Sequence, residues 1–301
     1  TLLNIPLPET RENIIKILKQ ESLICKGDNG KWNINNLGAI LFAKDINDFY
    51  SLKRKAVRII QYKSDNRMET IREQVISKGY ACGFESIIDF IKTIVPSNEV
   101  IGKALRKDFP MFPDLAIREL VANALIHQDF YITGTSPMIE IFTNRIEITN
   151  PGIPLVETDR FLDSPPKSRN EALASLLRRI GVCEERGSGI DKVIFQTEFY
   201  QLPAPLFENT QEYTRVVLFA HIDFDDMDKE DRIRACYLHA CLQYVQRKHL
   251  TNASLRERFG LKEANIAQAT RVINATIEKG LIKKIGTAES RKEAKYCPYW
   301  A

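Results

Sequence analysis

The chain has 301 residues, of which 44% are hydrophobic and 27% charged, with a formal net charge of +4. This length allows two or three domains with buried cores, and the composition excludes a chain that is disordered as a whole. No apolar run approaches the roughly 18 residues that a membrane-spanning helix needs, and no signal-peptide pattern begins the chain. A cytoplasmic protein with no membrane partner is therefore expected.

The six cysteines are scattered, with no C-x-x-C pair and no histidine at zinc-ligand spacing. Neither a disulfide framework nor a zinc site is indicated, and reduced thiols are expected.

The first third of the chain alternates helical and extended patterns. A helix is predicted over residues 8–20, followed by a Gly-Asp-Asn-Gly turn and an apolar stretch at 37–43. Residues 56–62 have the composition of a strand, and residues 85–95 have helical spacing. We interpret residues 1–110 as an N-terminal α/β segment that links to the next domain.

The next predicted helix, over residues 114–128, has a core side and a polar side. Glu119, Asn123 and His127 recur every four residues, which places them on one helical face. The opposite face is apolar and is predicted to be buried: Ile117, Leu120, Val121, Ala124 and Leu125.

A β-hairpin is predicted next, with strands at 137–142 and 145–150 around a tight Thr-Asn turn. Two glycine turns follow the hairpin. The first is Asn-Pro-Gly-Ile-Pro at 150–154, and the second is Gly187-Ser188-Gly189, which opens a helix. Between them lie the loop 164–170 and a helix over 171–181, and a final strand at 214–220 completes the unit.

The last part of the chain is basic and helical. An acidic run at 223–231 is interpreted as a linker. From Arg232 onward there are 14 Lys and Arg against 5 Asp and Glu, a net charge of +9, whereas the rest has 29 against 34, a net charge of −5. Three helices at 233–248, 252–260 and 262–280, the last two closed by glycines, precede a two-stranded hairpin. Residues 232–301 thus predict a winged helix-turn-helix domain.

The third of these helices is the candidate for contact with DNA. Its apolar residues are predicted to face the core: Ile266, Ala269, Val272, Ile273 and Ile277. Asn265, Gln268 and Arg271 then face outward and suit base edges and phosphates. The hairpin adds cations that can reach the DNA backbone: Lys283, Lys284, Arg291, Lys292 and Lys295. Protein contacts or dimerisation are the alternative use of such a domain.

The polar helix face and the glycine turns suit phosphate chemistry. Glu119 can act as a general base toward water, and the amide oxygen of Asn123 can bind Mg²⁺, which prefers oxygen ligands. Backbone N–H groups at Gly152, and at Gly187 and Gly189 before a helix, favour an anion. The alternative interpretations are a solvated helix face and glycines that only permit tight turns. For His127 we favour a structural role, with a hydrogen bond to Asp129.

Glu-x-x-x-Asn on a helix, then a hairpin ending in a glycine turn, then G-x-G opening a helix, is the motif order of the GHKL or Bergerat-fold ATPases, which this chain resembles. The resemblance implies a two-layer α/β sandwich over residues 111–222 within an α+β chain, binding ATP and Mg²⁺ under a lid. Glu119 would be the general base and Asn123 the Mg²⁺ ligand. The other implied nucleotide contacts are Asn150 and Gly152 at adenine, Gly187 and Gly189 at the phosphates, Arg169 in the lid, and His127.

Two departures from the common GHKL pattern point to one branch. Asn150 stands where the wider family has an aspartate, and Ile126-His127 replaces Asp-Ala. The string REL-x-x-NAL-x-H-x-D-F, with NPG, RN and E-x-G-x-G-I, resembles the divergent RecG-like ATP-binding family of proposed transcriptional regulators. A Schlafen/AlbA-like domain commonly precedes this region there. The start at Thr1 is therefore expected to be that of a fragment.

These features favour a nucleotide-binding transcriptional regulator that binds DNA through its winged helix. In this hypothesis, nucleotide binding closes the lid and shifts a homodimer, and so alters how the winged helix meets DNA. The sequence also allows two alternatives: an active ATPase that acts on nucleic acid, and a degenerate GHKL scaffold that serves dimerisation only. A G-x-x-x-x-G-K-[ST] phosphate loop is absent from the sequence.

Overall fold

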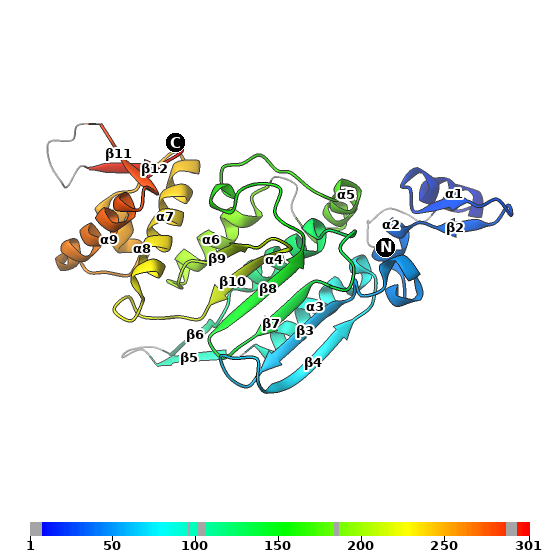
Figure 1. The fold of residues 1–301 in the computed structure, drawn as a ribbon, viewed down its shortest axis with the longest axis horizontal. Helices are drawn as coiled ribbons and strands as arrows, with labels where there is room; N and C mark the ends of the chain where they lie inside the picture. Colours follow the sequence, from blue (N-terminus) through cyan, green and yellow to red (C-terminus); the bar gives the residue numbers. More distant parts are fainter. Residues whose placement is uncertain (1–7, 96, 102–105, 184–186, 287–293) are drawn as a thin grey trace.

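The computed structural model describes residues 8–95, 97–101, 106–183, 187–286 and 294–301, with the backbone only for 97–101 and 106–110. Three parts follow one another along the long axis: an N-terminal unit of helices and a hairpin, a central sheet with helices, and a C-terminal helical unit (Figure 1). This mixed architecture confirms the predicted α+β class.

The N-terminal unit begins with the predicted helix, α1 (Arg11–Gln20). The Thr10 hydroxyl accepts a hydrogen bond from the Asn13 N–H and so caps the helix start. The Gly-Asp-Asn-Gly turn joins two short strands, β1 (Ile24–Lys26) and β2 (Trp32–Ile34), and the apolar stretch after them forms α2 (Asn36–Phe42).

The central sheet has six strands in the order β4-β3-β7-β8-β10-β9. Only β3 and β7 are paired in parallel, and the other neighbours are antiparallel. The predicted hairpin is present as β7 and β8, with Met138 opposite Thr149. The strands are β3 (Val57–Tyr62), β4 (Thr70–Ile76), β7 (Met138–Ile141), β8 (Arg145–Pro151), β9 (Leu206–Asn209) and β10 (Tyr213–Phe219).

Helices cover one face of this sheet and share a large apolar core with it. The helix predicted over 114–128 is α4 (Asp114–His127), and every residue of its predicted apolar side is buried. Helix α3 (Tyr80–Ile94) begins five residues before the predicted start at 85. The remaining helices of this part are α5 (Glu171–Arg179) and α6 (Gly189–Phe199).

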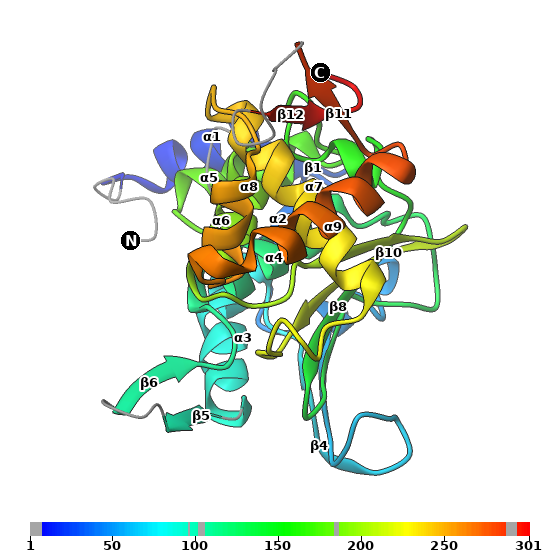
Figure 2. The same cartoon turned by 90° about the vertical axis from the view of Figure 1, so that its left-hand side faces the viewer.

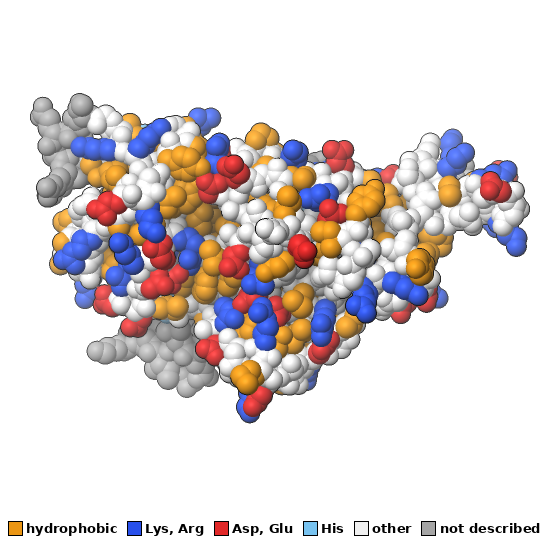
Figure 3. All heavy atoms as spheres, in the orientation of Figure 1, with side chains coloured by type: hydrophobic (Ala, Val, Ile, Leu, Met, Phe, Trp, Pro, Cys, Tyr) orange, Lys and Arg blue, Asp and Glu red, His pale blue; other side chains and the backbone are white. Residues whose placement is uncertain are grey.

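The other face of the sheet carries charged side chains over a small apolar cluster. The rings of Tyr62 and Phe142 stack with centroids 4.9 Å apart. Glu140 and Glu147 are buried beside them, and Arg67 binds both carboxylates at 2.6 Å. Both buried carboxylates thus share one guanidinium as a partner, and Figure 3 shows blue and red side chains mixed on this face.

The described residues of the C-terminal unit, 229–286 and 294–301, form three α-helices, a short 3-10 helix and a two-stranded antiparallel sheet. Figure 2 shows its helices lying in front of α4 and α6. The Asp228 carboxylate caps α7, so the first turn of this helix lies inside the predicted acidic linker of 223–231. The elements are α7 (Lys229–Val245), α8 (Asn252–Arg258), α9 (Ile266–Glu278), β11 (Ile282–Ile285) and β12 (Lys295–Pro298).

Two apolar residues of α9 depart from the prediction. Ala269, Val272 and Ile273 are buried as expected, but Ile266 is 46% exposed and Ile277 is 36% exposed. Thr276 takes the buried position, and its neighbour Ile277 is rotated by about 100° around the helix.

Several strands were not predicted, including β1 and β2 around the Gly-Asp-Asn-Gly turn. Strand β4 at the sheet edge is polar and exposed along nearly its whole length, and β9 has only four residues. Strands β5 (Ser97–Ile101) and β6 (Arg106–Pro110) form a separate antiparallel hairpin. Such strands lack the apolar alternation by which a strand is found in a sequence.

Candidate functional site

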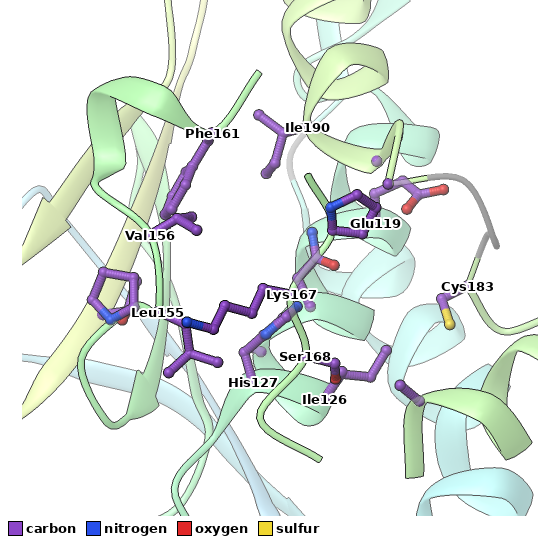
Figure 4. Close-up of a pocket in the computed structure, with 18 of the residues that line it drawn as sticks. Glu119, Ile126, His127, Leu155, Val156, Phe161, Lys167, Ser168, Cys183 and Ile190 are labelled. Atoms are coloured by element: carbon purple, nitrogen blue, oxygen red, sulfur yellow. The ribbon is translucent and has the colours of Figure 1, made fainter. Parts of the chain in front are cut away.

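The polar face of α4 lines a cavity of about 560 Å³, a size typical of small-molecule sites. Glu119, Asn123 and His127 all reach this cavity, as the spacing of four predicted. Figure 4 shows Glu119 and His127 with other lining residues around it. The helix therefore packs into the core with one face and lines the cavity with the other.

The cavity lies between α4, the strands β8 and β10, the segment after β8, and the start of α6. Apolar and polar residues are both present in its walls. The apolar part includes Leu120, Ile148, Leu155, Val156, Phe161 and Val216. The polar part includes Asn150, Thr214, Ser164, Ser175, Lys167 and Arg178. This mixture suits a ligand with a flat apolar body and a polar, charged end.

The second glycine turn brings backbone close to the polar face of α4. A Cβ atom at Gly189 would lie 2.8 Å from a carboxylate oxygen of Glu119 and 3.7 Å from the Asn123 amide nitrogen. Gly189 is also the first residue of α6, where the N–H groups of a helix favour an anion. Gly187 has φ +71°, and a Cβ there would meet Pro166 at 2.5 Å. Both predicted glycines line the cavity.

The first glycine turn acts through its backbone. The Gly152 N–H donates to the Glu212 carbonyl at 2.7 Å, and the Thr214 hydroxyl donates to the Gly152 carbonyl at 2.8 Å. Gly152 itself does not line the cavity, whereas Asn150 and Thr214, which are paired across β8 and β10, do. The role of Gly152 is thus to hold the end of β8 in place.

Arg169 binds protein groups behind the cavity wall. Its guanidinium donates to the Ile153 carbonyl at 2.7 Å and pairs with Asp129 at 3.3 Å. The expected hydrogen bond between His127 and Asp129 is not present among the described residues, because Asp129 instead accepts from Arg169 and from the Tyr131 N–H. His127 lines the cavity, so the expected partner of this histidine, Asp129, is corrected.

Burial lowers the pKa of His127, and the nearby charge of Arg169 lowers it further. In the unfolded chain the imidazole has its ordinary pKa of 6.5. Below that pH the unfolded chain takes up a proton that the folded chain resists, so stability from this group is fully present above about pH 6.5 and is lost as pH falls.

We expect His127→Asn to lose less stability than the wild type between about pH 7 and pH 5, because its unfolded chain has no imidazole at this position to take up a proton. Urea unfolding at several pH values measures this difference. The exposed His249, replaced in the same way, is the matched control. Equal losses in wild type and His127→Asn would contradict the expectation.

Several cavity residues were missed in the sequence. Lys167 and Ser168 lie in the loop 164–170, where the motif pointed only to Arg169, and Arg178 lies on α5. The Ser168 hydroxyl is buried with no hydrogen-bond partner among the described residues. In the loop, the basic and hydroxyl residues between the single Pro-Pro pair and the next helix were the available signal.

Some of the side chains predicted to contact DNA have polar neighbours within the protein, and others are exposed. The Asn265 amide donates to Gln268 at 2.6 Å, and the Gln268 amide lies 3.5 Å from the Asp225 carboxylate. Arg271, Lys283 and Lys284 are exposed on α9 and β11. Arg291 and Lys292 lie outside the described residues.

The described residues show neither a metal-ligand cluster nor a membrane-spanning helix. No group of three or more His, Cys, Asp or Glu side chains is placed there to hold a metal ion. None of the helices in those same ranges is long and apolar enough to cross a membrane.

Part of this region is similar to a known protein family. Residues 134–218, which include β7, β8, α5, α6 and β10, match the model of a family described as "Putative ATP-dependent DNA helicase recG C-terminal". The match supports an ATPase-like domain in this stretch. No curated protein matches the chain.

Among solved structures, the chain is similar to the crystal structure of the DIP2311 protein from Corynebacterium diphtheriae. The TM-score is 0.53 with 13% sequence identity, and the alignment covers 94% of this chain and 64% of that chain. At this identity the likeness concerns the fold alone, and the chain spans less than two thirds of that protein.

Proposed function

We propose that the cavity binds an ATP-type nucleotide with Mg²⁺, and that the chain is a transcriptional regulator of the GHKL type. The observation that carries the proposal is the convergence of Glu119, Asn123 and His127 with Gly189 in one cavity. The ATPase-like family match over the adjoining strands and helices supports the same interpretation.

The residues present fit a nucleotide. Lys167 and Arg178 line the cavity and can neutralise phosphate charge, and the bare backbone at Gly189 leaves room that a side chain would fill. Bound Mg²⁺ would neutralise charge on the phosphates, and the Asn123 amide oxygen is the residue that would hold it. Asn150, beside Thr214, would meet the base.

The direct test is a calorimetric titration of ATP with Mg²⁺ into the wild-type chain. Micromolar binding is expected, and a titration without heat and without any thermal shift would overturn the proposal. Hydrolysis is a second candidate function, favoured by the position of the Glu119 carboxylate in the cavity next to Gly189. Phosphate release by the wild type would support it.

The second half of the proposal is that the C-terminal unit binds DNA as a winged helix, with α9 as the recognition helix. Its support is the order of three helices and an antiparallel strand pair, the net charge of +9 from Arg232 onward, and the exposed Arg271 and Lys283. The resemblance to regulators adds a homodimer as the proposed assembly.

We expect Arg271→Ala combined with Lys283→Ala to weaken DNA binding at all sequences, because each cation is expected to contact a phosphate. The slope of log K against log salt should fall by about 2, since each contact contributes roughly 0.9. Fluorescence anisotropy across a salt series measures it. Lys26→Ala with Lys31→Ala, on the exposed β1–β2 hairpin, is the control pair. A wild-type DNA affinity that does not change with salt concentration would contradict the DNA proposal.

A further inference from the structure

The segment after β8, residues 153–168, forms one wall of the cavity, and we call it the cavity loop. Figure 4 shows Leu155, Val156 and Phe161 of this loop on one side of the cavity. Lys167 and Ser168 line the cavity at the end of the loop. Any ligand that fills the cavity therefore touches the loop.

The opposite side of the cavity loop is bound to the C-terminal unit. The Tyr237 hydroxyl of α7 donates to the Asp159 carbonyl at 2.6 Å, and the Tyr299 hydroxyl donates to the Asp159 carboxylate. The Arg160 guanidinium lies 4.7 Å from the centroid of the Trp300 ring. These contacts join residues far apart in the sequence, and two of the three aromatic side chains come from the last three residues of the chain.

Adjacent residues of the loop point in opposite directions. Phe161 lines the cavity, whereas Leu162 is buried in the apolar core of the C-terminal unit. The turn between these contacts is a short 3-10 helix (Thr158–Arg160), and an ion pair between Arg160 and Asp163 closes it. The loop is therefore compact, and a shift on the cavity side displaces the side that meets the C-terminal unit.

Helix α6 provides a second connection between the same two regions. Its first residue, Gly189, faces the cavity next to Glu119. Near its other end, Glu198 accepts from His239 of α7 at 2.9 Å and lies 3.6 Å from the Arg258 side chain of α8. The α6 helix is 11 residues long, and it reaches from the ligand cavity to the C-terminal core.

We propose that ligand occupancy of the cavity and the seating of the C-terminal unit are coupled through the cavity loop, with Asp159 held by Tyr237 and Tyr299 as the connection. This inference rests on the proposed nucleotide site and names its regulation. A ligand that contacts the loop stabilises its position, and so strengthens the contacts to α7 and to the end of the chain. Because coupling is reciprocal, loss of those contacts weakens ligand binding.

The test compares Tyr299→Phe with Tyr296→Phe. Both remove one hydroxyl, but Tyr296 is not hydrogen-bonded to the cavity loop in the part of the chain that the structure describes. We expect Tyr299→Phe to raise the Kd for ATP with Mg²⁺ about 3- to 10-fold, the effect of one lost hydrogen bond, and Tyr296→Phe to leave it unchanged. Neither residue lines the cavity.

Hydrogen exchange measured by mass spectrometry supplies a readout that needs no ligand. In the ligand-free proteins, Tyr299→Phe should speed exchange in residues 153–168, and Tyr296→Phe should not. In the wild type, added ATP with Mg²⁺ should slow exchange in residues 229–245 as well as at the cavity.

The outcomes separate the two proposals. If the wild type binds the nucleotide, but Tyr299→Phe binds it equally well and protection stays confined to the cavity, the coupling is overturned and the nucleotide site stands. If the wild type binds no nucleotide, the proposed ligand is overturned. Hydrogen exchange in the ligand-free proteins then decides whether the cavity loop and the C-terminal unit are linked. Equal exchange of residues 153–168 in Tyr299→Phe and Tyr296→Phe would overturn the coupling as well.

Discussion

Replacement of Asn123 by alanine should abolish the binding of ATP with Mg²⁺ that we expect of the wild-type chain. Asn123 is the middle residue of the polar row on α4, between Glu119 and His127, and it lines the cavity close to Gly189. Alanine removes the amide oxygen that would bind Mg²⁺ and leaves the helix intact, since alanine favours helix.

The size of the effect follows from the charge of the ligand. A hydrogen bond or ligand contact to a charged group contributes about 1.5–3 kcal/mol, which corresponds to roughly 10- to 150-fold in affinity. Binding in the micromolar range would then fall to the edge of what calorimetry detects.

A matched control separates a lost ligand contact from a damaged fold. Asn209→Ala makes the same chemical change at an exposed position on β9, away from the cavity. It should bind as the wild type does, and both variants should unfold at nearly the wild-type temperature. Unchanged binding by Asn123→Ala would mean that the polar face of α4 does not hold the nucleotide.

The polar face of α4 could be predicted from the sequence because it depends on one local property. The spacing of four residues determines both which side of the helix packs into the core and which side chains line the cavity. The same holds for the β7–β8 hairpin, whose alternation is local. Lys167 and Arg178 could not be predicted in this way. They enter the cavity because the cavity loop and α5 are positioned by distant contacts, such as the Asn170 amide that donates to the carbonyl groups of Ile126 and Gln128.

Long-range contacts explain the other differences as well. Asp129 was expected to bind His127, which lies two residues away, but the ion pair with Arg169, 40 residues later, takes its carboxylate. Strand β4 has no apolar alternation, and it is a strand because β3 offers it a free edge. In both cases tertiary structure overrides a local pattern.

Gly152→Ala should lower the free energy of unfolding by roughly 2–4 kcal/mol. Two separate costs contribute. Gly152 has φ +100°, which disfavours every other residue, and a Cβ there would lie 2.8 Å from the Asp129 Cβ and 3.2 Å from its backbone nitrogen. Those atoms cannot move aside easily, because the Asp129 N–H donates to the Pro151 carbonyl at 2.8 Å.

Gly134→Ala is the control that separates the two costs. Gly134 also has a positive φ, +78°, but a Cβ there would have no atom within 4 Å. Gly134→Ala should lower the free energy of unfolding by about 1 kcal/mol, from the unfavourable backbone conformation alone. Denaturant unfolding of both variants measures the difference, which isolates the close approach of the turn to Asp129.

The same comparison bears on the nucleotide site. Gly152 follows Asn150 at the end of β8 and precedes Ile153, whose carbonyl binds Arg169, so a displaced turn moves the cavity wall near the expected base. Gly152→Ala should therefore weaken nucleotide binding as well as stability, whereas Gly134→Ala should affect neither strongly. Equal losses of stability in the two variants would show that only the backbone conformation requires glycine at 152. The close contact between the turn and the end of α4 would then have no part in holding the cavity.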